Sequence, residues 1–164
     1  MLETLVISLD CNTCNVCNSL KKLPKELFIQ STSVSSVPGK KLSADVMRRA
    51  GQKILVVRDT LTSFTAASFA KDETASELRD ALIVTCLPMQ FQCSTIKVDC
   101  APALRSLRND SRLSSLGISL NLGEEKNPNK NPIADKAIQE LELELLKLTG
   151  DSSPVSNTCL TQAI

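Results

Sequence analysis

The sequence predicts an α/β fold in which a mixed sheet of about five strands is flanked by helices. Three strand-like segments follow one another between residues 42 and 70, and the clearest contains the apolar run Ile54-Leu55-Val56-Val57. Two further short apolar segments, 95–98 and 117–122, each follow a helix-like segment. A long amphipathic stretch over 133–148 closes the series. Adjacent strands followed by alternating helices and strands are typical of a mixed sheet with helices on both faces.

Turn residues set the limits of the first three strands. Residues 42–49 are expected to form the first strand, and Gly51-Gln52 the turn to a second strand over 53–60. Residues 63–70 lie close enough in sequence to pair with the second strand as a hairpin. The three segments should therefore lie side by side in the sheet.

Three helices are expected between and after the short strands. Thr74 and Glu77 have the spacing of a capping box, which predicts the start of the first helix. Pro102 suits the first turn of the second helix. The third helix covers 133–148 and ends at Gly150, because glycine favours the position after a helix C-terminus. Its apolar face comprises Ala134, Ala137, Ile138, Leu141, Leu145 and Leu148.

Composition excludes several classes of protein. The 164 residues include no His, Trp or Tyr. The chain therefore lacks imidazole for zinc binding or general-base catalysis, and it lacks the aromatic surface on which single strands of nucleic acid stack. The net charge is only +1, but residues 1–58 contain nine Lys and Arg against four Asp and Glu, whereas residues 59–164 contain ten against fourteen. The basic first third is compatible with phosphate contacts at one end of the chain.

The cysteines and the apolar runs predict where the protein works. An odd count of seven Cys does not fit a disulfide framework, and Met1–Leu9 lacks the cationic start of a signal peptide. No apolar run reaches the length of a membrane span. We therefore expect an intracellular protein with reduced thiols and without a membrane partner.

The chain divides by composition into four parts. Residues 1–24 contain three of the cysteines, and residues 25–39 form a Ser/Thr-rich linker that closes with the turn Pro38-Gly39. The predicted folded domain covers 40–150. Residues 151–164 are predicted to form a loose polar tail.

Without His, the candidates for chemistry are carboxylates. Asp45 lies in the first strand, Asp99 follows the strand over 95–98, and Asp135 falls in the first turn of the last helix. Ligands of open α/β sheets usually bind at the carboxyl ends of the strands, and three carboxylates that converge there form an oxygen cage for Mg²⁺ or Mn²⁺. On spacing alone a structural role stays open, with Asp135 near a helix N-terminus and the other two at partly exposed strand ends.

These residues resemble the signature of the integrases of LTR retrotransposons and retroviruses, of the gypsy/Pao-like kind. That signature is Asp, then a second Asp, thirty-five residues and Glu, and here Asp99 and Asp135 bracket thirty-five residues. The resemblance covers residues 11–149. The matching stretches are Leu42-Ser43-Ala44-Asp45, Ile54-Leu55-Val56-Val57-Arg58-Asp59, Lys97-Val98-Asp99-Cys100-Ala101-Pro102 and Asn127-Pro128-Asn129-Lys130-Asn131-Pro132-Ile133-Ala134-Asp135-Lys136.

The resemblance implies an RNase H-like fold and the chemistry of the DDE polynucleotidyl transferases. Asp45, Asp99 and Asp135 would be both the catalytic residues and the ligands of Mg²⁺ or Mn²⁺, which supports phosphodiester cleavage and strand transfer in DNA integration. The resemblance also implies DNA as the partner, allows a homo-oligomer and suits a location in the nucleus. The basic residues expected to contact the DNA backbone are Lys40, Lys41, Arg48, Arg49, Lys130 and Lys136.

Residues 1–24 resemble a remnant of the zinc-binding module at the N-terminus of these integrases. That module uses two His and two Cys ligands, and its paired cysteines match Cys14 and Cys17. Because the chain has no His, half of the ligand set is missing and a zinc ion is not expected.

Four residues bear on how far the family pattern holds. Asp135 stands in place of Glu and is one methylene shorter, which should weaken the binding of one metal ion. Cys100 stands in place of the usual Asn beside the second Asp. Glu142 is expected on the outer face of the last helix, where an acid repels phosphate. Asp59 follows the strongest strand but matches no metal ligand, so we assign it a structural or surface role.

The resemblance is to a fragment, truncated at its C-terminal end, because the sequence stops where the core of the family continues into further helices. The expected function is that of an integrase catalytic domain fragment with weakened or lost activity. A non-catalytic nucleic-acid-binding remnant of a retrotransposon polyprotein is the alternative.

Overall fold

The computed structural model describes residues 36–87, 95–123 and 131–164. Three residues named above as candidate ligands or DNA contacts lie outside these ranges, namely Cys14, Cys17 and Lys130. In the described ranges no helix combines the length and the apolar character that crossing a membrane requires.

The sheet has five strands in the order β3-β2-β1-β4-β5, which confirms the predicted mixed sheet. β1 pairs antiparallel with β2, and β2 pairs antiparallel with β3. β4 pairs parallel with β1, and β5 pairs parallel with β4. The strands are β1 (Lys41–Arg49), β2 (Gln52–Asp59), β3 (Thr65–Ala70), β4 (Thr95–Val98) and β5 (Ser119–Leu122).

A two-residue turn joins β1 to β2. Ala50 and Gly51 occupy it, with φ of 46° and 80°, and Arg49 pairs directly with Gln52. Two successive positive φ values match the right-handed twist of a hairpin, and glycine adopts such a value without strain. The turn therefore lies one residue earlier than the predicted Gly51-Gln52 pair.

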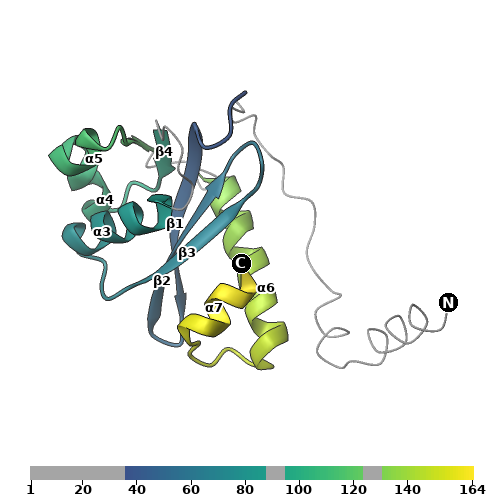
Figure 1. The fold of residues 1–164 in the computed structure, drawn as a ribbon. Coiled ribbons are helices and arrows are strands. Elements are labelled where there is room, and N and C mark those ends of the chain that lie inside the picture. Colours follow the sequence, from purple (N-terminus) through teal and green to yellow (C-terminus); the bar gives the residue numbers. More distant parts are fainter. Residues whose placement is uncertain (1–35, 88–94, 124–130) are drawn as a thin grey trace.

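Helices cover both faces of the sheet (Figure 1). Leu55 and Val57 of β2 are fully buried on the side of the first group of helices, whereas Ile54 and Val56 are fully buried on the side of the second group. A strand that is covered on both faces has no polar side, which explains the continuous apolar run in β2. The first group of helices is α3 (Ala75–Cys86), α4 (Pro102–Ser106), the 3-10 helix η2 (Leu107–Asn109) and α5 (Ser111–Ser115), and the second is α6 (Pro132–Thr149) and α7 (Asn157–Ala163).

The prediction of a loose polar tail over 151–164 is wrong, because this segment folds back onto α6 and the sheet. Val155 and Leu160 are buried at 6% and 4% exposure in the core between α6, α7 and the sheet. Gln52 fixes the return of the chain, since its amide donates to the carbonyl of Val155 at 2.9 Å and accepts from the Val155 N–H at 2.7 Å. Cys159 and Ala163 pack partly buried against the same core, so a few scattered apolar residues hold this short helix in place.

α3 begins where predicted, but the capping box does not form. Thr74 makes no cap hydrogen bond, and its hydroxyl donates to Asp72 Oδ1 at 2.5 Å instead. Glu77 Oε1 accepts from the backbone N–H of Lys71 at 2.9 Å. Glu77 therefore bonds to the backbone of the segment before the helix, and it does not bond to the backbone N–H of the N-cap residue Thr74.

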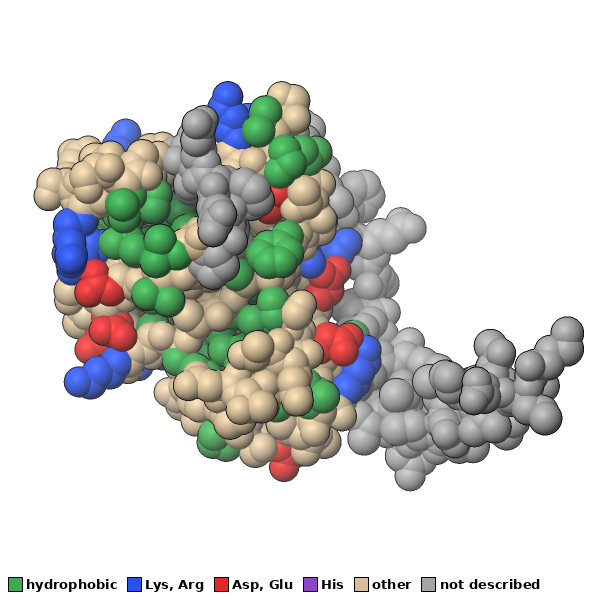
Figure 2. All heavy atoms as spheres, viewed as in Figure 1, with side chains coloured by type: hydrophobic (Ala, Val, Ile, Leu, Met, Phe, Trp, Pro, Cys, Tyr) green, Lys and Arg blue, Asp and Glu red, His purple; other side chains and the backbone are tan. Residues whose placement is uncertain are grey.

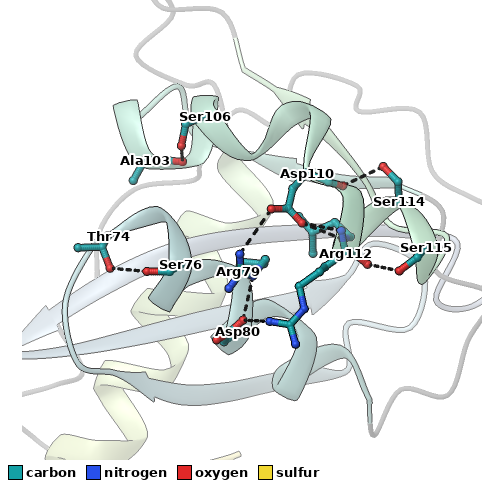
Figure 3. Close-up of polar contacts among 11 residues, drawn as sticks. Thr74, Ser76, Arg79, Asp80, Ala103, Ser106, Asp110, Arg112, Ser114 and Ser115 are labelled. Atoms are coloured by element: carbon teal, nitrogen blue, oxygen red, sulfur yellow. Dashed lines mark hydrogen bonds and ion pairs between the residues drawn. The ribbon is translucent and has the colours of Figure 1, made fainter.

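A group of charged side chains joins α3 to α5 (Figure 3). Arg79 of α3 lies between Asp80, at 2.9 Å, and Asp110, at 3.6 Å. Asp110 also caps α5 by accepting from the backbone N–H groups of Arg112 and Leu113 at 2.9 and 3.0 Å. These contacts fix the helices on this face of the sheet as one layer.

Candidate active site

The register of two parallel strands brings Asp45 and Asp99 to one level. Lys41 pairs with Thr95, and the register continues to Ser43 with Lys97. Two more residues along each strand are Asp45, inside β1, and Asp99, directly after the end of β4. Because β4 ends there, Asp45 lies at an open edge of the sheet, where α/β folds usually bind ligands.

Both carboxylates line the same cleft. Its volume is about 450 Å³, and its walls include Asp45, Asp99, the ion pair of Arg48 with Glu73, and the start of α4 from Pro102. Asp45 Oδ1 accepts from the N–H of Val46, and Asp99 Oδ1 accepts from the N–H of Cys100, each at 2.7 Å. The backbone thus orients each carboxylate in the same way, and the structure brings these two predicted site residues together.

Asn131 fastens the start of α6 to the sheet beside the two carboxylates. Its side-chain amide donates to the carbonyl of Ala44 at 2.9 Å and to that of Lys97 at 3.4 Å, and its Oδ1 accepts from the hydroxyl of Ser43. Asn131 and Ser43 are buried at 3% and 1% exposure. Ala44 and Lys97 stand one and two residues before the candidate aspartates, so this contact sets where α6 meets the site.

The sequence interpretation did not single out Asn131. It included the residue only as a member of the matching stretch over 127–136. The signal was an Asn directly before Pro132, because Asn is favoured at a helix N-cap and Pro at the first helical position. The structure shows both residues buried at the start of α6.

Asp135 lies in the first turn of α6, and its N–H donates to the carbonyl of Asn131 at 3.0 Å. The residues that line the cleft include Asp45 and Asp99 but not Asp135. Across the described ranges, no three or more Asp, Glu, Cys or His side chains gather closely enough to hold a metal ion. The structure therefore places Asp135 at the same end of the sheet without joining it to the other two.

Arg49 is not available to DNA, and its predicted phosphate contact is corrected to a structural role. Its side chain is 1% exposed and donates to Glu142 Oε1 at 2.6 Å, to Thr149 Oγ1 at 2.9 Å and to the carbonyl of Ser153 at 2.9 Å. It also donates to the carbonyl of Asp151. Because side chains alternate between the two faces of a strand, Arg49 points toward α6, where its N–H donors are hydrogen-bonded to these oxygens.

The expectation for Glu142 is corrected with it. Glu142 does not stand alone on the outer face of α6, since its side chain is only 32% exposed and pairs with Arg49. The paired charge presents less repulsion to a phosphate than the sequence suggested.

Arg48 is the arginine that faces the cleft. Its side chain is 72% exposed, and its guanidinium donates to both carboxylate oxygens of Glu73, each at 2.7 Å. The two hydrogen bonds and the opposite charges raise the pKa of Arg48 and lower the pKa of Glu73. A phosphate that enters the cleft meets this ion pair at its rim.

The other predicted basic contacts within the described ranges, Lys40, Lys41 and Lys136, are not among the residues that line the cleft. Lys40 is exposed and Lys41 is half-buried. Lys136 is exposed and lies 3.8 Å from Glu140, one turn along α6. On the face drawn in Figure 2, most Lys and Arg side chains lie beside Asp or Glu, so positive charge occurs in small groups.

Asp59 has the structural role assigned to it. It is buried at 1% exposure and accepts from the N–H of Leu61, from the N–H of Thr62 and from the Thr62 hydroxyl, the last at 2.6 Å. These bonds shape the turn between β2 and β3, and neither Asp59 nor Thr62 is among the residues that line the cleft.

Comparisons with known proteins recover the fold. No protein-family model matches the sequence, and no curated protein matches it. A chain of the simian T-cell lymphotropic virus intasome in complex with PP2A regulatory subunit B56 gamma is similar over 92% of this chain, with 20% identity and a TM-score of 0.72. The match covers 55% of that chain, so this protein spans about half of its length.

The catalytic core domain of BIV integrase is similar over 76% of this chain and 80% of its own, with 20% identity and a TM-score of 0.62. These likenesses confirm the predicted RNase H-like fold of an integrase core.

Proposed function

We propose that the chain is an integrase catalytic domain fragment that cleaves and joins DNA phosphodiesters at the cleft between β1 and β4. The observation that carries the proposal is the shared level and shared cleft of Asp45 and Asp99. Two aspartates at the open edge of an integrase-like sheet form the kind of site that metal-dependent phosphoryl chemistry uses.

The residues present suit one hard divalent cation. Mg²⁺ keeps several waters and is commonly held by one or two carboxylates together with substrate phosphates. Asp45 and Asp99 supply two carboxylates in a cleft of about 450 Å³, which leaves room for a phosphate. When bound, Mg²⁺ or Mn²⁺ supplies Lewis-acid stabilisation of the phosphoryl charge and activates the attacking hydroxyl.

Asp135 is proposed as the third ligand, with a weakened role. Asn131 positions the first turn of α6 close to the residues that precede Asp45 and Asp99. The Asp side chain is one methylene shorter than the Glu of the family pattern, which fits its absence from the cleft wall. Lengthening this side chain should therefore restore activity.

The test is a Mn²⁺-dependent strand-transfer assay on the purified chain. Asp99→Asn should abolish product, and Asp135→Glu should raise it, whereas Asp80→Asn removes a carboxylate outside the cleft and should leave product unchanged. Equal product from the wild type and Asp99→Asn would overturn the assignment of the site. Product lost equally in Asp80→Asn would show that the effect is not specific to the cleft.

The runner-up is a non-catalytic DNA-binding protein with the same fold. The observation that favours it is that three potential metal ligands do not gather in the described ranges. It predicts salt-dependent DNA binding without turnover, weakened when Lys40, Lys41 and Arg48 are neutralised together. Arg49 is left out of this variant because it is buried.

Assembly and location follow from the same proposal. One structural neighbour is part of an intasome, and we propose that this chain also acts on DNA as a homo-oligomer, in the nucleus. Sedimentation with and without a short duplex would test the assembly.

A further inference from the structure

The rim of the cleft carries an ion pair that no metal-ligand role explains. Arg48 and Glu73 line the same cleft as Asp45 and Asp99. The guanidinium donates through Nε to one carboxylate oxygen and through Nη2 to the other, each at 2.7 Å. Arg48 reaches the cleft from the end of β1, and Glu73 from the segment just before α3.

We propose that Glu73 occupies the position that a DNA phosphate takes on Arg48, so that this pair is an exchangeable phosphate-binding subsite at the cleft. In the free protein the carboxylate of Glu73 holds the guanidinium, and in the complex a backbone phosphate replaces it. The inference rests on the proposed function in one respect, namely that DNA is the ligand of the cleft.

The chemistry of the two acceptors supports the exchange. Carboxylate and phosphate both present two oxygens to the parallel N–H groups of a guanidinium, so either satisfies the same two donors. The side chain of Arg48 is 72% exposed, and exposed ion pairs contribute little to stability. A phosphate can therefore compete for the donors without first disrupting the core.

Glu73 also keeps a second cation near it. The hydrogen bond and charge of Arg48, with a contribution from the charge of Lys53, hold the pKa of Glu73 below its usual value. When a phosphate takes Arg48, Lys53 remains close to the released carboxylate. Arg49 provides the contrast, because it is buried and its donors are consumed by four separate oxygens.

Glu73 thus opposes DNA binding in two ways. It competes for the donors of Arg48, and its negative charge adds to those of Asp45 and Asp99 in the cleft. Removing the charge alone would lessen repulsion whether or not Arg48 is involved. The experiment must therefore separate competition from charge.

A double-mutant cycle makes that separation. The affinity for a short fluorescein-labelled DNA duplex is measured by anisotropy in EDTA at fixed salt, for the wild type, Glu73→Gln, Arg48→Gln and the double variant. We expect Glu73→Gln to tighten binding about fivefold and Arg48→Gln to weaken it by a similar factor. In the Arg48→Gln background, Glu73→Gln should change the affinity by less than about twofold.

Asp72→Asn is the matched control. Asp72 is one residue from Glu73 and carries the same charge, but its Oδ1 accepts from the N–H and the hydroxyl of Thr74, which Asn can still satisfy. Its neutralisation should change DNA affinity by less than about twofold.

The outcomes separate the two proposals. Equal tightening by Glu73→Gln with and without Arg48, or equal tightening by Asp72→Asn, would overturn the exchange, as would a failure of both the wild type and Glu73→Gln to bind the duplex. The binding measurements need no turnover. If Glu73→Gln tightens DNA binding only when Arg48 is present, but product is unaffected by Asp99→Asn, only the proposed catalysis would be overturned. Loss of product in Asp99→Asn, together with a Glu73→Gln effect on DNA affinity that is the same with and without Arg48, would overturn only the exchange.

Discussion

Two adjacent arginines of β1 have opposite surroundings. The side chain of Arg48 is 72% exposed and makes one ion pair at the cleft, whereas that of Arg49 is 1% exposed and bonds to four oxygens of α6 and of the chain after it. Successive strand residues point to opposite faces of the sheet. The same residue type is therefore an exposed ion-pair partner on one face and a buried structural anchor on the other.

The comparison extends along β1. On the face toward α6, Ser43 bonds to Asn131 near one end of the strand and Arg49 bonds to Glu142 at the other, with Met47 buried between them. These two polar contacts fasten both ends of α6 to the same strand. The same alternation places Asp45 on the α6 side of β1 and Arg48 on the α3 side, so the cleft that both residues line reaches both faces of the strand. The exposed ion pair lies on the α3 side, and the two buried anchors lie on the α6 side.

The largest expected effect is the loss of the anchor on the α6 face. Arg49→Met leaves the partly buried Glu142 and three further acceptors without their donor, and should lower the free energy of unfolding by about 3 kcal/mol. Arg48→Met should lower it far less, because exposed ion pairs contribute little. Urea unfolding of both variants at neutral pH measures the difference.

Equal losses in the two variants would contradict the division between the faces. Arg49→Lys serves as a control for charge, because it keeps the positive charge but cannot reproduce the separate N–H donors of a guanidinium. It should remain clearly less stable than the wild type.

The second effect concerns the other end of α6. Asn131→Ala removes the bonds to Ala44, Lys97 and Ser43 and should lower the free energy of unfolding by about 2 kcal/mol. Ser43→Ala removes only the shared hydroxyl and should cost about half as much. Hydrogen exchange should show the loss of protection first in the initial turns of α6, whereas Arg49→Met should affect its last turns.

Uniform loss of protection along α6 in both variants would show that the helix is not fastened independently at its ends. The anchors lie at opposite ends of β1, so their effects on stability should also add in the double variant.

Sequence reasoning predicted most of the elements because their signals are local. Apolar runs and turn residues define the strands, and the spacing of apolar residues defines α3 and α6. It missed α7, since the apolar residues in and just before this helix are few and scattered: Val155 and Leu160 are buried, and Cys159 and Ala163 pack partly buried beside them. Packing against α6 supplies the remaining stability of that helix, and packing is not visible in local composition.

The sequence predicted two aspartates that the structure brings together, but it did not predict the partners of the basic residues. The resemblance pointed to Asp45 and Asp99, and the parallel register places them together. The sequence interpretation grouped Arg48 with Arg49 because both carry a positive charge. Their different acceptors, Glu73 and Glu142, come from segments distant in the sequence. The role of Asn131 depends on three long-range contacts, which no local pattern contains.

The smallest expected effect is the pH dependence of the exposed pair. The hydrogen bond from Arg48 lowers the pKa of Glu73 in the folded protein. A lowered pKa adds stability that is complete above the unfolded value, about 4.3 for Glu, and is lost as the pH falls through the folded value. The stability difference between the wild type and Arg48→Met should therefore be small at neutral pH and vanish in acid.

The anchor on the other face should behave differently. Three of the four acceptors of Arg49 are the hydroxyl of Thr149 and the carbonyls of Asp151 and Ser153, which do not titrate. Most of the loss caused by Arg49→Met should therefore persist at the pH where the Arg48→Met difference has vanished. Urea unfolding of both variants and the wild type from neutral to acid pH follows the two differences together. If the two stability differences declined in parallel, the contribution of Arg49 would come from its bond to the Glu142 carboxylate alone. The two arginines would then differ only in their exposure.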